Sequence, residues 1–87
     1  MDRQFLYDFD ETATIRFVSF FADEGRFDLA IVKSDHFFGK RIVLDMQKNR
    51  FAIIGEDDLA EPGYLEDAFG LDAASAITLK QFLEEVI

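Results

Sequence analysis

The sequence predicts an α+β fold, in which an antiparallel meander of four to five strands is followed by two C-terminal helices packed on one face. Three observations favour this fold. The first half alternates β-branched and aromatic residues, its segments are joined by turns of only two to four residues, and the last third changes to a helical period. At 87 residues we expect a single domain covering 1–87, with strands in about 3–55 and helices in about 62–86.

Four segments have the composition of strands. The run 12–21, TATIRFVSFF, is β-branched and aromatic, and RFDLAIVK at 26–33 alternates well between the two faces. The run 37–47, FFGKRIVLDMQ, carries Gly39 inside it, which predicts a bulge or a close backbone approach, and RFAIIG at 50–55 follows a tight turn. Short connections join antiparallel neighbours and cannot house parallel crossovers, so the segments form a meander. The N-terminal QFLYDF can add a fifth strand.

The last third has helical signals. Pro62 suits a first helical turn, and the stretch 63–69 has helical composition. Gly70 then suits a left-handed C-cap, and Asp72 is a good N-cap for a second helix that runs to about Glu85. Apolar residues recur there at spacings of three and four, which gives one stripe to lay on the sheet.

Both faces of the predicted sheet carry bulky apolar side chains, although two helices cover only one face. Eleven of the 87 residues are Phe. Uncovered apolar patches on small soluble proteins mark interfaces, and symmetric dimers are the commonest oligomers. We therefore expect a homodimer formed through an aromatic sheet face, with the interface residues Val18, Phe20, Phe37 and Val43. The alternative is strong sheet curvature that buries both sets of side chains internally.

Few residues could carry catalysis. There is no cysteine, a single histidine (His36), and no phosphate-binding glycine motif, so we expect no enzyme activity, no cofactor and no metal site. The densest polar cluster comprises Glu56, Asp57, Asp58 and Glu61. Its spacing lacks the regularity of a Ca²⁺ loop, and whether it binds a cation stays open. The spacing of Asp58 and Glu61 also fits a capping box at a helix start.

The charge pattern bears on partners. The formal net charge is −9, and residues 55–87 carry nine acids against Lys80 alone. Such a field repels nucleic acid and anionic membranes. A weak single-stranded nucleic-acid binder remains the alternative function, because Arg16, Lys40 and Arg41 lie near aromatic residues that could stack on bases. No apolar run is long enough to span a bilayer and no signal peptide is visible, so we expect no membrane contact and a cytoplasmic location.

Several segments resemble a family of small, uncharacterised bacilli proteins classed as a domain of unknown function. The resembling segments are RFVSF at 16–20, RFDLAI at 26–31, RFAIIG at 50–55 and DDLAEPGYLEDAFGL at 57–71. The resemblance covers most of the chain. It implies a cytosolic protein of about this length with an α+β fold, no established activity and no catalytic residues to carry over.

Overall fold

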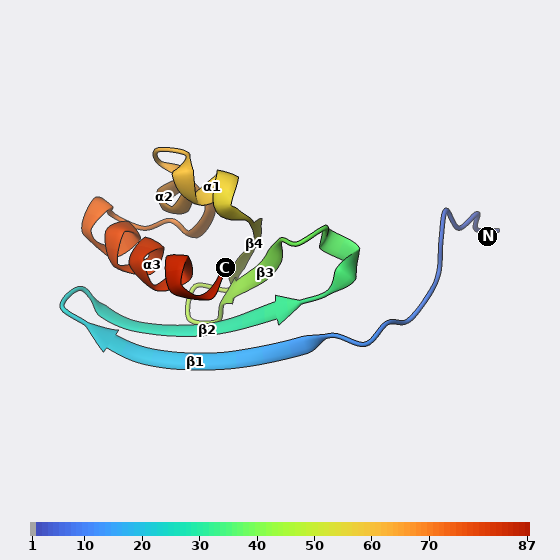
Figure 1. Cartoon of the computed structure of the whole chain (residues 1–87), viewed down its shortest axis with the longest axis horizontal. Helices are drawn as coiled ribbons and strands as arrows, with labels where there is room; N and C mark the ends of the chain where they lie inside the picture. The colour runs from blue at the N-terminus through green and yellow to red at the C-terminus, as the bar shows by residue number, and fades with distance from the viewer. Residues whose placement is uncertain (1) are drawn as a thin grey trace.

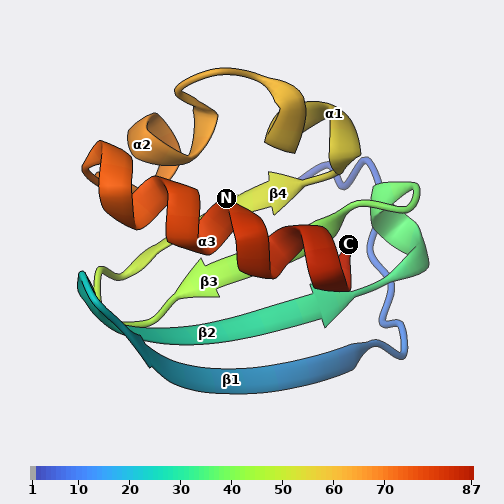
Figure 2. The ribbon, with the colours of Figure 1, turned by 60° about the vertical axis from the view of Figure 1, so that its left-hand side comes forward.

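The computed structural model describes residues 2–87 and contains one four-stranded antiparallel sheet with three helices on one of its faces (Figures 1 and 2). The strands follow one another in the order β1-β2-β3-β4, which is the predicted meander. The elements are β1 (Thr14–Ala22), β2 (Gly25–Lys33), the 3₁₀ turn η1 (Asp35–Phe37), β3 (Arg41–Asp45), β4 (Arg50–Ile54), α1 (Glu56–Ala60), α2 (Tyr64–Phe69) and α3 (Ala73–Val86). The α+β prediction is confirmed.

A long hairpin of β1 and β2 forms one side of the sheet. Its register runs from Ala22 opposite Gly25 to Thr14 opposite Lys33, so a two-residue turn joins two nine-residue strands. Gly25 has a φ of 133°, a conformation that side-chain-bearing residues rarely adopt. Because directly opposite residues share a face, this turn decides which residues of β1 lie beside which residues of β2.

The connection between β2 and β3 differs from the prediction. The run expected to be one strand from residue 37 begins with η1, and β3 starts only at Arg41. Ser34 caps the turn by accepting a hydrogen bond from the backbone N–H of His36, and Phe38 and Gly39 then adopt φ values of 54° and 86°. Two consecutive left-handed residues cannot continue a strand, so Gly39 reverses the chain before β3 and forms no bulge within it.

The two predicted helices are present, and a third, short helix precedes them. Gly70 ends α2 with a φ of 65°, and Asp72 begins α3 by accepting a hydrogen bond of 2.8 Å from the N–H of Ser75. The additional helix α1 has five residues and follows β4 directly. Its start is capped through Asp58 and the N–H of Gly55, one turn earlier than the capping box predicted from Asp58 and Glu61.

A single cluster of buried side chains lies between the sheet and the helices. The sheet contributes β-branched, leucine and phenylalanine side chains from β2, β3 and β4, and each helix contributes at least one residue. The members are Phe27, Leu29, Ile31, Val43, Ile54, Leu59, Leu65, Phe69, Ala76, Leu79 and Leu83. The helices therefore cover one face of the sheet and leave the opposite face without a layer of its own (Figure 2).

The N-terminal residues form no fifth strand within the chain. Residues 2–13 contain neither helix nor strand and run outward from the start of β1, beyond the body of the molecule (Figure 1). The described part of the chain has extents of 50 × 24 × 24 Å, and the long dimension includes this segment. None of the helices in residues 2–87 has the length and apolar character needed to cross a bilayer.

Candidate interaction surface

The face of the sheet that the helices leave uncovered is called here the open face. The register and the alternation of side chains along each strand define its members. They are Ile15, Phe17, Ser19, Phe21, Arg26, Asp28, Ala30, Val32, Ile42, Leu44, Phe51 and Ile53. Most of these side chains are apolar, so the open face is a candidate site for binding another apolar surface.

The aromatic residues of the open face are strongly exposed. Phe17 is 71%, Phe21 82% and Phe51 65% exposed, and Ile15 at the start of β1 is 56% exposed. A phenylalanine at such exposure leaves most of its ring in water, which is unfavourable by roughly 25 cal/mol per Å² of apolar surface. The prediction that a second apolar face remains uncovered is therefore confirmed.

The residues predicted to form the interface do not lie on this face, and that prediction is wrong. Val43 is completely buried in the core beneath the helices, and Val18 packs against the same core. Phe20 stacks on Phe27 at a ring-centroid distance of 5.2 Å and contacts Phe82 of α3 at 5.1 Å.

Phe37, the fourth predicted interface residue, lies in η1 and not on a strand. Its ring meets that of His36 edge to face at 5.0 Å. The helices thus cover Val18, Phe20 and Val43, the strand residues that we expected on the uncovered face.

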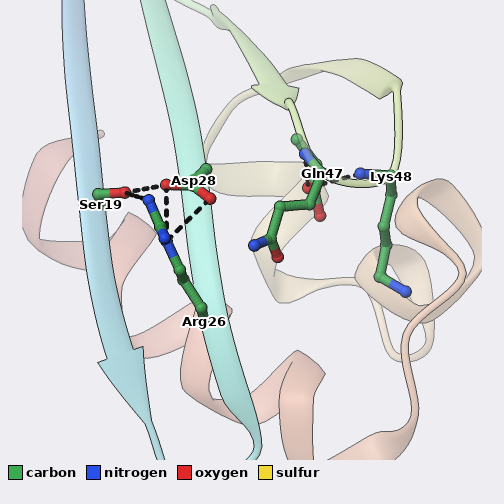
Figure 3. A network of polar contacts seen from close by, with 6 residues as sticks. Ser19, Arg26, Asp28, Gln47 and Lys48 are labelled. Atoms are coloured by element: carbon green, nitrogen blue, oxygen red, sulfur yellow. Dashed lines mark hydrogen bonds and ion pairs between the residues drawn. The ribbon is translucent and has the colours of Figure 1, made fainter.

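One polar cluster lies on the open face, across the β1–β2 hairpin (Figure 3). Arg26 forms an ion pair with Asp28 at 3.0 Å, and Ser19 donates a hydrogen bond to the same carboxylate from the neighbouring strand. The Arg26 guanidinium also lies 5.9 Å from the centre of the Phe21 ring, within the range of a cation–π contact. The two charges of the open face neutralise one another, so the face as a whole carries no net charge.

Other carboxylates bind backbone groups and so hold turns and helix starts. Asp45, which is 3% exposed, accepts hydrogen bonds of 3.2 Å from the N–H groups of both Gln47 and Lys48 (Figure 3). A hydrogen bond from the Ser75 N–H holds the pKa of Asp72 below its ordinary value. These carboxylates stabilise local structure, because a side-chain acceptor satisfies a backbone donor that the turn leaves without a partner.

Two members of the predicted acidic cluster, Asp57 and Asp58, bind groups of their own chain. Asp58 accepts hydrogen bonds from the Gly55 N–H at 2.9 Å and from Lys40 Nζ at 3.0 Å, and Lys40 also reaches Asp57 at 3.4 Å. The Gly55 hydrogen bond lowers the pKa of Asp58, with a further contribution from Lys40, and the hydrogen bond to Asp58 raises the pKa of Lys40. Within residues 2–87, no group of three or more His, Asp or Glu side chains is arranged to hold a metal ion.

The three basic residues named for nucleic-acid contact do not gather beside the exposed aromatic rings. Arg16 lies over the Phe82 ring on the helical side of the sheet, with its guanidinium 5.9 Å from the ring centre. Lys40 is ion-paired with α1, and Arg41 donates a hydrogen bond of 2.7 Å to the Gly39 carbonyl. No cation other than Arg26 lies among the residues of the open face. The ingredients of a base-stacking surface are therefore on different sides of the sheet.

Sequence reasoning missed Ile15, Phe17, Phe21 and Phe51 as the exposed set. A signal was present, because Ser19, Arg26 and Asp28 share their face, and polar residues on a strand mark the side that meets water.

No curated protein matches the chain. A family model described as SAV0927-like, an uncharacterised family of small proteins, matches residues 6–85. The match covers the sheet, the helices and most of the N-terminal segment, and the chain belongs to the SAV0927-like family.

Proposed function

We propose that the protein is a non-enzymatic interaction module that self-associates as a homodimer through the aromatic side chains of its open face. One observation carries this proposal: Phe17 and Phe21 on β1 and Phe51 on β4 are each more than 60% exposed on one continuous sheet face. Contiguous exposed apolar surface of this kind on a small protein marks an interaction site. A second copy of the chain supplies the same surface by symmetry.

The charge distribution supports a second copy as the partner. With a net charge of −9, two copies repel one another over most orientations. The open face is an exception, because its only charged residues are Arg26 and Asp28, which are paired. Contact there brings apolar surfaces together without opposing like charges. Added salt screens the remaining repulsion, so self-association is expected to persist or strengthen as salt rises.

The test is the solution mass, measured by light scattering after size exclusion at several protein concentrations and at low and high salt. The natural sequence is expected to give the mass of a dimer that high salt does not dissociate. Phe17→Asp places a charge in the contact and is expected to give a monomer with an unchanged far-ultraviolet circular dichroism spectrum.

The matched control is Ile77→Asp on α3, because Ile77 is also exposed, at 59%, but lies on the helical side of the molecule. It is expected to leave the mass unchanged. A natural sequence that stays monomeric at every concentration, or a folded Phe17→Asp variant that stays dimeric, would overturn the proposal.

A further inference from the structure

The two edges of the sheet are protected to different degrees. At the β4 edge, α2 packs alongside, and Tyr64 Oη lies 3.4 Å from the Ile53 carbonyl as a hydrogen-bond donor. At the β1 edge, no backbone group of Thr14–Ala22 makes a hydrogen bond other than those to β2, within residues 2–87. The strand is nine residues long and contains neither proline nor lysine, and its single charged residue, Arg16, lies over the Phe82 ring on the helical side.

The N-terminal segment, residues 2–13, is called here the arm. Four large apolar side chains are exposed on it: Phe5 by 67%, Leu6 by 98%, Tyr7 by 66% and Phe9 by 56%. The radius of gyration is 14.7 Å, compared with about 12 Å for a compact chain of this length. The arm thus exposes apolar surface in a position where its own core cannot cover it (Figure 1).

Few contacts hold the arm to its own chain. The rings of Tyr7 and Phe9 each lie 5.7 Å from the ring of His36, measured between centroids. Glu11, nearer to β1, contacts Ser34 and lies 3.9 Å from His36 Nδ1. Residues 2–6 make no hydrogen bond or ion pair with the rest of the described chain. Moving residues 5–9 to another partner therefore costs only the two aromatic contacts with His36.

We propose that the arm of each copy pairs antiparallel with the outer edge of β1 in a second copy, so that each sheet gains its fifth strand from its partner. This proposal rests on the self-association proposed above, but it places the contact at the β1 side of the open face, around Phe17, and not at Phe51 on β4. The arm and β1 are continuous in the chain, so the exchange is reciprocal about one two-fold axis close to residue 12. Each bare β1 edge then acquires backbone partners.

The side-chain pattern fits one register of this pairing. As an extended strand, the arm places Phe5, Tyr7 and Phe9 on one face and Leu6 and Asp8 on the other. A two-fold axis at residue 12 then gives the pairs Phe9 with Ile15, Tyr7 with Phe17, Phe5 with Ser19, Leu6 with Val18 and Asp8 with Arg16. The aromatic residues of the arm extend the open face, whereas on the other face apolar meets apolar and acid meets base.

A shift of one residue would destroy this match. It would put Asp8 among the aromatic residues of the open face and turn Tyr7 toward Arg16, because side chains alternate strictly along a strand. Stacking two open faces against one another is the competing arrangement. It would cover Phe21 and Phe51 but leave the backbone groups of the β1 edge unpaired and the arm exposed, whereas strand exchange gives both the edge and the arm a partner.

The test uses cysteine pairs, since the chain has no cysteine of its own. Asp8→Cys and Arg16→Cys proteins are prepared separately, mixed in equal amounts and oxidised gently. Directly opposite residues in an antiparallel pair have Cα atoms about 4.5–5.5 Å apart, within the range of a disulfide. The mixture is expected to give a covalent dimer containing one chain of each kind, while each protein alone gives almost none, because like positions lie roughly 27 Å apart in this register.

The control replaces Arg16→Cys with Lys80→Cys on the exposed surface of α3, which is expected to give no covalent dimer with Asp8→Cys. A second control is the solution mass of the Phe51→Asp variant, measured by light scattering. This variant is expected to stay dimeric, because β4 is the strand farthest from the exchanged arm.

The outcomes separate the two proposals. A protein that is dimeric by light scattering but gives no mixed disulfide would overturn strand exchange and leave self-association standing. Dissociation of the dimer by Phe51→Asp would also overturn exchange, because it would point to stacked faces. A protein that is monomeric at every concentration would overturn both.

Discussion

The two faces of the sheet are made from alternate residues of the same four strands, and both are apolar. On the helical face, Leu29 and Val43 are completely buried, while on the open face Phe17 and Phe21 are 71% and 82% exposed. Hydrophobicity alone therefore does not decide which face the helices cover. The polar residues contribute to the choice, because a helical layer over Ser19, Arg26 and Asp28 would have removed an ion pair from water at a cost that its Coulomb attraction does not reliably offset.

The first way to sharpen this comparison is to remove a core aromatic side chain. Phe69 of α2 is completely buried against the sheet. Phe69→Ala is expected to lower the free energy of unfolding by about 3–5 kcal/mol, because it removes apolar contacts and leaves a cavity. Urea unfolding followed by circular dichroism measures this. A loss below about 1 kcal/mol would mean that the helical layer contributes little to the stability of the sheet.

The order of elements and several of their ends could be predicted from the sequence. Gly70 and Asp72 were identified as the end of one helix and the start of the next because a left-handed glycine and a capping carboxylate act through local chemistry. The meander could be predicted for a similar reason, since expected connections of two to four residues leave only antiparallel neighbours within reach. In each of these cases the deciding chemistry lies within a few residues of chain.

The choice of face was missed although Ser19, Arg26 and Asp28 gave a signal for β1 and β2, because on β3 and β4 it depends on contacts between distant segments. Val43 and Ile42 are neighbours with similar side chains, and only Val43 belongs to the buried cluster between the sheet and the helices. The segment Phe37–Phe38–Gly39 was also misassigned to a strand. Its apolar composition fits a strand, but the cap from Ser34 and the left-handed Phe38, which is 96% exposed, form a turn.

The next prediction has a smaller expected effect on stability and concerns Asp58, which holds the start of α1 through its contacts with Gly55 and Lys40. The charged form of Asp58 is stabilised by the Gly55 N–H and by Lys40, and its pKa in the folded protein lies below the ordinary aspartate value. At a pH above the ordinary aspartate pKa, Asp58 therefore contributes its full stabilisation of the folded state. This stabilisation is lost as the pH falls through the lowered pKa that Asp58 has in the folded protein. Asp58→Asn is expected to reduce stability at neutral pH by about 1 kcal/mol.

The pH series provides the check on this assignment. Urea midpoints of the natural sequence and of Asp58→Asn, measured from about pH 6 down to about pH 3, are expected to converge as the pH falls. Asp72→Asn serves as a comparison, because its carboxylate also has a lowered pKa but caps α3 and does not contact Lys40. Curves for Asp58→Asn and the natural sequence that stay parallel over the whole range would show that the carboxylate charge has no role in holding α1.

The smallest expected effect is the most informative about the open face. Phe51→Ala makes the same truncation as Phe69→Ala, but Phe51 is 65% exposed and lies directly opposite Leu44 on β3. The loss of that pair is expected to cost less than about 1 kcal/mol, when unfolding is measured in the Phe17→Asp background so that self-association does not contribute. A cost equal to that of Phe69→Ala would mean that the open face is already part of the monomer core. Exposed aromatic surface would then no longer argue for a partner, and the observation that carries the proposed function would be gone.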